Sequence, residues 1–363
     1  MSAGNGHSRL EELAGGAGQT PFCPLYGKCG GCSLQHVDYA AQIEGKRALL
    51  AETMRRAGIG VETQSIAAVP SPAREYRSRL TFHALRANRG PRTAFKSRGG
   101  KALIPVDDCP VADPALRKVL RDGAIIPPPG KDRFTLYGKD GLVIGEAEVD
   151  GRSRRRGEFI FLGKKLTVDA GCFFQSNAAL LEKLLLQVRR GVEAYAPHSP
   201  ASGMGDLYAG VGTFSVFLAE AAGASAERKA DSGAADRDLP LIDLVEANSA
   251  ALDAARINLG RHYPQGRFRF FAQSAEKWKP RGKWAFAIAD PPRQGLAPIL
   301  RGWLCAAGPS VLYYVSCEPS SLARDCRSLL KSYILKELTF YDFYPQTEHI
   351  ESLAVLERRG CAE

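Results

Sequence analysis

The chain has 363 residues, of which 45% are hydrophobic and 24% charged, as in an ordinary globular protein with two or three cores. No apolar run reaches the roughly 18 residues of a membrane-spanning helix, and the first twenty residues lack the apolar core of a signal peptide, so we expect a cytoplasmic protein. The formal net charge of +10 favours an acidic partner such as a nucleic acid.

A cysteine-rich segment follows a short N-terminal tail and predicts a metal site. Cys23, Cys29 and Cys32 lie in one tight loop, in which Gly30 and Gly31 leave room for a bulky ligand. Cys109 is the candidate for a fourth ligand. Four cysteines suit zinc and iron–sulfur clusters alike. A disulfide framework is a poor explanation, because the chain has nine cysteines and no export signal.

The next part of the chain predicts a small, mostly antiparallel β domain. A helix is expected from about Asp38 to Ala57, and short alternating runs then fill residues 76–166 between Gly- and Pro-rich turns. Residues 74–101 contain nine Lys or Arg residues and one acidic residue, Glu75. A second basic group lies at 152–156. Such density suits RNA phosphates, although a solvated basic surface gives the same pattern.

The last part of the chain alternates helices and strands and predicts a doubly wound α/β domain. A helix is expected at about 177–194 and strands at 205–208, 241–246, 284–290 and 310–316. Residues 222–240 are small, polar and charged, which indicates a flexible insertion. The four predicted parts are a disordered tail (1–20), a cluster segment (21–66), a basic RNA-binding β domain (67–165) and the α/β domain (166–363).

A glycine turn follows the first strand of the α/β domain. In the run from Asp206 to Thr213, backbone amides at a helix start can meet a ligand closely. Ser215 replaces the third glycine of a dinucleotide fingerprint. Glu246 ends the next strand, where an acid binds ribose hydroxyls. The combination favours S-adenosylmethionine over a dinucleotide.

Three residues near the ends of later strands could carry out chemistry. Asp290-Pro-Pro-Arg293 lacks the aromatic residue that amino-group methyltransferases use to stack a base. Cys317 ends an apolar strand, and a thiolate that adds to carbon 6 of a pyrimidine activates carbon 5 toward a methyl donor. A lone cysteine is otherwise most often a small core residue. A carboxylate must later remove the proton on carbon 5, and Glu351 is the chosen candidate.

Together these motifs resemble the uracil-5 methyltransferases of ribosomal and transfer RNA, from Cys23 to about Leu356. The matching runs are Cys23-x5-Cys-Gly-Gly-Cys32 with Gln35-His36, Tyr76-Arg77, Phe173–Asn177, Asp206–Phe214, Asp290–Leu296, Ser316–Pro319, Ala323–Asp325 and Pro345–Glu351.

The resemblance implies a class I, Rossmann-like S-adenosylmethionine-dependent methyltransferase domain behind an N-terminal Fe–S segment and the small β domain. It implies a 4Fe–4S cluster on Cys23, Cys29, Cys32 and Cys109, with Cys317 as nucleophile and Glu351 as base. The methyl donor, S-adenosylmethionine, would contact Gln175, Tyr208, Thr213, Glu246, Ser274 and Asp290.

The sequence also departs from the family. Glu318 stands where asparagine usually follows the nucleophile, and its charge is expected to raise the pKa of Cys317. We expect the small N-terminal β-barrel of many relatives to be absent, so that RNA contact falls to the cluster loop and the basic β domain. Members with cysteines and no barrel are similar to enzymes that methylate large-subunit ribosomal RNA.

The leading hypothesis is therefore a monomeric methyltransferase that acts on carbon 5 of a uridine in 23S ribosomal RNA, without a membrane or an obligate protein partner. Transfer RNA as the substrate is the first alternative. A catalytically silent RNA-binding relative is the second, although Cys317, Glu351 and Asp290 are all retained. A dehydrogenase is a distant further alternative, which Ser215 disfavours.

Overall fold

The computed structural model describes residues 10, 12–15, 18–86, 92–195, 203–231, 240–279 and 282–360, and for 224–231 the backbone only. The chain divides into two compact units. The first comprises residues 1–50, 68–181 and 342–350, and the second comprises 51–67, 182–341 and 351–363. No helix among the described residues combines the length and the apolar character needed to cross a membrane.

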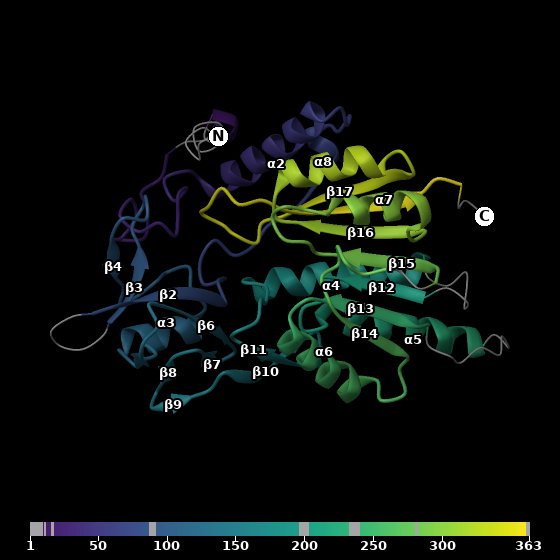
Figure 1. The fold of residues 1–363 in the computed structure, drawn as a ribbon. Helices are drawn as coiled ribbons and strands as arrows, with labels where there is room; N and C mark the ends of the chain where they lie inside the picture. The colour runs from purple at the N-terminus through teal and green to yellow at the C-terminus, as the bar shows by residue number, and fades with distance from the viewer. Residues whose placement is uncertain are drawn as a thin grey trace. The chain divides into compact units, whose positions relative to one another are not determined.

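The second unit is built on a large sheet with the strand order β1-β17-β18-β16-β15-β12-β13-β14, most of which can be followed in Figure 1. Five neighbouring strands are parallel: β12 (Gly203–Leu207), β13 (Ile242–Glu246), β14 (Phe268–Ala272), β15 (Trp284–Ala289) and β16 (Val311–Ser316). All six residues of β16 are buried, as expected for a parallel strand covered on both faces. The predicted doubly wound α/β domain is thus confirmed.

Helices connect these strands. They are α5 (Thr213–Asp231), α6 (Ser249–His262), α7 (Pro298–Ala307) and α8 (Pro319–Leu329), and α4 (Ala178–Tyr195) precedes β12. Asn248 caps α6 by accepting hydrogen bonds from the amides of Ala250 and Ala251. Proline occupies the first turn of both α7 and α8, where no amide donor is needed. Each helix therefore starts directly after a strand or its loop.

An antiparallel hairpin completes the sheet and was not predicted. β17 (Tyr333–Tyr341) turns back into β18 (Glu351–Arg358), and β18 lies between β17 and β16. All strand residues from Glu351 to Leu356 are buried. The last strand in the sequence therefore lies inside the sheet.

The first unit contains the β domain expected from the alternating runs. Its five-stranded sheet has the order β4-β3-β2-β6-β7, and β5-β8-β9 and β10-β11 form two smaller sheets. The pairings within these sheets are antiparallel, and Phe82 stacks on Phe95 and Phe134 in the core. The strands are β2 (Arg79–Leu85), β3 (Arg92–Lys96), β4 (Leu103–Pro105), β5 (Ile125–Ile126), β6 (Arg133–Lys139), β7 (Leu142–Gly145), β8 (Glu148–Val149), β9 (Arg152–Ser153), β10 (Arg156–Phe161) and β11 (Lys164–Asp169).

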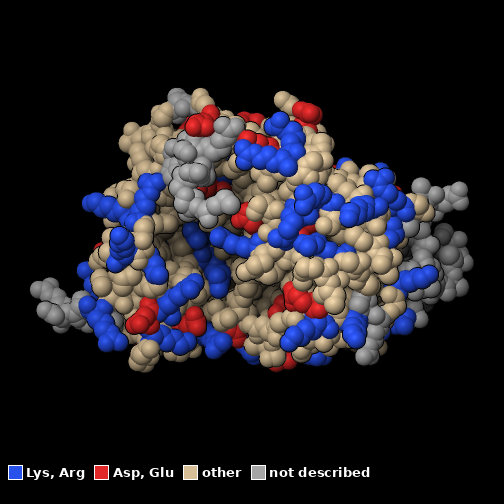
Figure 2. Space-filling model, turned by 45° about the horizontal axis from the view of Figure 1, so that its top comes forward, with Lys and Arg blue, Asp and Glu red and all other residues tan. Residues whose placement is uncertain are grey.

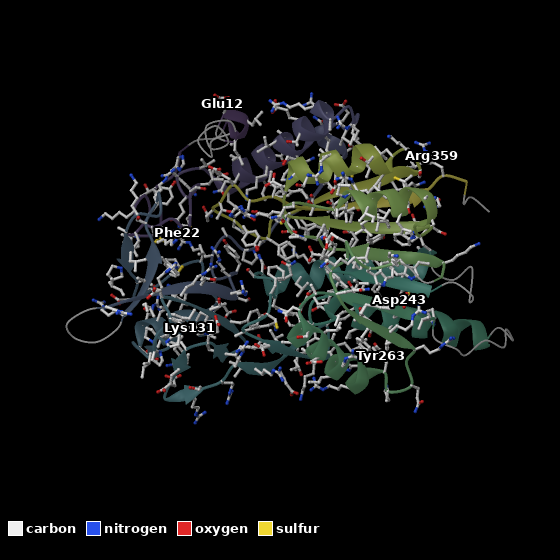
Figure 3. The ribbon with its side chains drawn as sticks, in the orientation of Figure 1. Glu12, Phe22, Lys131, Asp243, Tyr263 and Arg359 are labelled. Carbon is white, nitrogen blue, oxygen red and sulfur yellow. The ribbon has the colours of Figure 1, made fainter. Side chains whose placement is uncertain are left out.

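The remaining elements are α2 (Tyr39–Arg56), a 3-10 helix (Thr63–Ser65), β1 (Ala67–Val69) and α3 (Pro114–Arg121). The bounds of α2 agree with the helix expected at 38–57. Phe22, labelled in Figure 3, packs in the first unit under the guanidinium of Arg74, 4.1 Å from the ring centre. The segment 342–350 joins this unit through the hydrogen bonds of α2 described below.

One boundary differs from expectation. Helix α5 extends to Asp231, through the first part of the segment 222–240 that was assigned to a flexible insertion. Alanine is the best helix former, and the run from Ala219 to Ala230 is rich in it. Residues 232–239 lie outside the described part of the chain, as do residues 1–9 of the expected tail.

Candidate active site and cysteine pocket

The candidate active site lies at one edge of the large sheet in the second unit. Because β12, β13, β15 and β16 are parallel and adjacent, the loops that follow them leave from the same edge. These loops carry Tyr208, Asp290 and Cys317, and Glu246 ends β13. Parallel strand direction therefore brings these four predicted residues to one edge of the sheet.

Antiparallel pairing brings Glu351, the predicted base, close to Cys317, the predicted nucleophile. Ser316, the last residue of β16, pairs with Ser352 of β18. Cys317 follows Ser316 and Glu351 precedes Ser352, so both leave the same point of the ladder. Two residues that are far apart in the sequence thus become neighbours, which the predicted strands alone did not indicate.

Electrostatics at this point keep the thiol protonated at rest. Burial, as the largest cause, together with the charges of Glu351 and Asp290 raises the pKa of Cys317 to about 12, while Arg293 acts in the opposite direction. Burial also raises the pKa of Glu351 well above its usual range, again with Asp290 adding and Arg293 opposing. The thiol, two carboxyls and one guanidinium form one interacting group, and shifted pKa values of this kind are typical of active sites.

Glu318, which was expected to raise the pKa of Cys317, instead caps helix α8. Its carboxylate accepts hydrogen bonds from the amide and the hydroxyl of Ser320 and caps α8. The largest influences on the pKa of Cys317 are burial, Glu351 and Asp290. Glu318 therefore serves the start of α8, a role in which a short polar residue such as asparagine also works.

Asp325 has a supporting role that the sequence analysis did not assign. It is fully buried and accepts hydrogen bonds from the amide of Leu296 and the hydroxyl of Tyr314, both at 2.7 Å. Ser321 donates to the carbonyl of Arg293 at 2.7 Å. Helix α8 thereby holds the loop 290–296 against β16. Gly295 is required here, since its φ is +73° and a Cβ would lie 2.4 Å from Asp325.

The glycine turn after β12 is braced by two acids. Asp206 accepts from the amide and hydroxyl of Ser215, at 3.1 and 2.6 Å, and so fixes the first turn of α5. Glu246 accepts from the amides of Gly210 and Asn248. The turn itself has positive φ at Tyr208, Gly210 and Gly212, and a Cβ on Gly212 would lie 2.9 Å from Ala255. The backbone is thus preformed where a ligand can approach it.

The remaining residues predicted to contact S-adenosylmethionine belong to both units. Thr213 is buried at the start of α5, and Ser274 lies in the turn after β14, where its carbonyl accepts from Lys277 and Trp278. Tyr208 donates to Glu276 in the same turn. Gln175 belongs to the first unit, and its contact with the methyl donor stays a prediction.

Asp206 makes the stability of the protein depend on pH. Burial raises its pKa from 3.8 to about 7. The unfolded state therefore loses this proton near pH 4, whereas the folded state keeps it to about pH 7, so the contribution to the free energy of unfolding declines as pH rises between these values. We expect Asp206→Asn to flatten this decline, measured by urea unfolding at pH 5 and 7. An equal decline in both proteins would assign it to other groups.

The four predicted cluster cysteines all line one cavity in the first unit. Its volume is about 560 Å³, and Cys23, Cys29, Cys32 and Cys109 lie in its wall. All four are free thiols. The three-cysteine loop and Cys109 are far apart in the sequence, so folding assembles the set. No three His, Cys, Asp or Glu side chains among the described residues converge on a single metal ion.

Arg77 is one of several cationic residues that line this cavity. Its side chain also lines the cavity wall, and its buried Nε has no hydrogen-bond partner in the described part of the chain. Burial raises the pKa of Cys32 to about 11 and that of Cys109 to about 12, while Arg77 lowers both. A partly buried, incompletely bonded cation that interacts with three of these thiols fits a negatively charged ligand such as a thiolate-bound cluster.

The chain is similar to known RNA uracil-5 methyltransferases. The family model described as tRNA (Uracil-5-)-methyltransferase matches residues 281–359, which hold Asp290, Cys317 and Glu351. A 23S rRNA (uracil(1939)-C(5))-methyltransferase RlmD from Vibrio parahaemolyticus is 28% identical over 93% of this chain and 82% of its own. The corresponding RlmD from Shewanella sediminis is 29% identical over 93% and 81%. These matches support the RNA uracil-5 methyltransferase family for this chain.

A solved structure shows the same fold. The Pyrococcus abyssi tRNA (uracil-54, C5)-methyltransferase, in complex with S-adenosyl-L-homocysteine, covers 90% of this chain and 85% of its own, with a TM-score of 0.65 and 22% identity. The methyltransferase fold expected from the sequence motifs is therefore confirmed.

Proposed function

We propose that the protein transfers the methyl group of S-adenosylmethionine to carbon 5 of a uridine in 23S ribosomal RNA. The observation that carries this proposal is the position of Cys317 and Glu351 at the ends of paired strands, beside Asp290 and Arg293. A nucleophile and a carboxylate base at one point are what this reaction requires.

The reaction uses both residues in turn. Cys317 loses its proton to solvent and adds to carbon 6, which moves electron density to carbon 5. Carbon 5 takes the methyl group and S-adenosylhomocysteine leaves. Glu351 then removes the proton from carbon 5, and the bond between Cys317 and carbon 6 breaks. The raised pKa of Glu351 makes its carboxylate a stronger base once ionised.

Ribosomal RNA is favoured as the substrate by the similarity to RlmD over most of both chains. A basic surface offers the phosphate contacts, since Lys and Arg are more widespread than Asp and Glu on the face shown in Figure 2. Transfer RNA is the second candidate, because the Pyrococcus abyssi neighbour is a tRNA methyltransferase.

The test is methyl transfer from labelled S-adenosylmethionine to unmodified ribosomal RNA and transfer RNA, followed by nucleoside analysis. We expect labelled 5-methyluridine in ribosomal RNA. Label in transfer RNA alone would replace the substrate with the second candidate. No label in either RNA, from folded protein, would favour a silent RNA-binding relative.

We also propose that Cys23, Cys29, Cys32 and Cys109 hold a 4Fe–4S cluster. The support is the shared cavity, its size, and the buried charge of Arg77 beside three of the thiols. The cluster would be a structural ligand that ties the cysteine loop to the β domain through Cys109, and its iron would supply no step of the methyl transfer.

Anaerobically reconstituted protein is expected to contain iron and acid-labile sulfide in a one-to-one ratio, close to about four of each per chain. Cys109→Ala should lose most of both. Cys305→Ala is the matched control, because Cys305 lies on α7 outside the cavity. Zinc in place of iron, or equal iron in both variants, would contradict the cluster assignment.

A further inference from the structure

The loop between β17 and β18 delivers the base to the active site. Tyr341 and Glu351 pair with each other, so residues 342–350 are the connection of a hairpin whose last neighbour is Glu351 itself. This loop belongs to the first unit, whereas both strands belong to the second. Whatever fixes the loop therefore also limits how Glu351 can move.

Gln346 is the most constrained residue of this loop. It is fully buried, and its φ of +66° lies in the left-handed region that glycine favours. Its carbonyl accepts hydrogen bonds from the amides of Ser33 and Leu34, at 2.8 and 3.0 Å. These two residues follow Cys32 directly, so the cysteine loop is bonded to the loop that ends at Glu351.

Gln42 on α2 holds both loops at once. Its side-chain oxygen accepts from the amide of Gln346 at 3.0 Å, and its Nε2 donates to the Oε1 of Gln346 at 3.0 Å. The same Nε2 also donates to the carbonyls of Leu34 and Val37, each at 2.9 Å. Gln42 is fully buried, so water cannot replace these bonds when the side chain is removed.

Further contacts fix the rest of the loop. Lys46, also on α2, forms a fully buried ion pair with Asp342 at 2.7 Å. The hydroxyl of Tyr76 donates to the carbonyl of Pro345, and Asn177 donates to that of Phe343. These contacts hold the loop in the first unit independently of Gln42, so loss of Gln42 should displace the loop locally and leave the unit folded.

We propose that Gln346, clamped by Gln42, is a positioning residue for Glu351 and couples the cysteine loop to proton removal from carbon 5. The inference rests on the proposed function and goes beyond it, because the cysteine segment then acts on one catalytic step. Cys317 is carried by β16 and α8, which this clamp does not touch. Loosening the clamp should therefore slow proton removal and spare the formation of the covalent adduct.

The first variant to test is Gln42→Ala. We expect kcat to fall roughly ten- to hundredfold, since a displaced catalytic group costs about this much. KM for RNA and for S-adenosylmethionine should stay within about twofold of wild type. The specific signature is a methylated covalent RNA–protein adduct that accumulates, detected as label from S-adenosylmethionine migrating with the protein on a denaturing gel.

A second variant, Gln346→Gly, keeps the backbone hydrogen bonds and the left-handed φ and removes the side-chain bonds to Gln42 and to the carbonyl of Ala73. We expect the same signature at smaller amplitude. Gln19→Ala is the control, because Gln19 bonds the carbonyls of Gln35 and Val37 in the same region and has no bond to the loop. It should behave as wild type.

Outcomes separate this inference from the proposed function. If both variants fold and show the wild-type turnover rate and adduct level, the inference is wrong and the proposed function is unaffected. Parallel loss of adduct and product in Gln346→Gly would also overturn it, because a general defect then replaces a defect in one step. Wild-type protein that methylates neither RNA would remove both the function and the inference.

Discussion

Cys317→Ala is expected to abolish methyl transfer, with a fall in rate on the order of 10⁴ or more. Without the thiolate, carbon 5 of uracil is too weak a nucleophile to take a methyl group. Alanine keeps most of the packing of this side chain, so the free energy of unfolding should change by about 1 kcal/mol or less. Labelled 5-methyluridine and the covalent adduct should disappear together.

Cys305→Ala again provides the control, because its thiol donates only to the carbonyl of Ser328 away from the site. It should retain full activity. Residual turnover of a few per cent or more in Cys317→Ala, with S-adenosylmethionine binding intact, would show that another group activates the uracil ring. The assignment of Cys317 as the nucleophile would then be wrong.

Glu351→Gln is expected to stop the reaction one step later. The amide cannot remove the proton from carbon 5, so product formation should fall roughly 10²- to 10⁴-fold. Cys317 and the methyl donor are both still present, so methylated RNA should remain bonded to the protein. The variant also removes a carboxyl that raises the pKa of Cys317, which should speed formation of the adduct at neutral pH.

Denaturing gels and rapid-quench kinetics measure both effects in the same samples. The adduct level in Glu351→Gln sets the upper limit against which Gln42→Ala is compared. If Glu351→Gln releases product at the wild-type rate, another carboxylate is the base, and Asp290 becomes the candidate because it interacts with both groups.

The sequence was enough to predict where the strands end. It was only partly enough to predict which strands lie next to one another. Apolar runs located β13, β15 and β16, and parallel order then placed Asp290 and Cys317 at one edge of the sheet. Glu351 was chosen by resemblance to the family, because Thr347–Glu351 is polar and gives no strand signal. Its burial follows from pairing with residues far away in the sequence, which no local pattern contains.

The supporting residues were the hardest to predict. Asp325 and Gln42 are polar residues on helices, and a helical pattern assigns such residues to a solvated face. In the structure both are fully buried because each completes several hydrogen bonds to loops from distant parts of the chain. The cysteine set was predictable as a list, whereas the buried cation Arg77 became apparent only from the folded cavity.

The position of β18 determines when, during synthesis, the growing chain can complete the large sheet and the candidate active site. Residues 351–358 leave the ribosome after both strands that flank them in the sheet, β16 and β17. A nascent chain that ends before them has the thiol and the glycine turn, and lacks both the base and the strand that closes the sheet. Under the proposed mechanism such a chain cannot release methylated RNA, and the edges of β16 and β17 stay open to chaperones until β18 has been made.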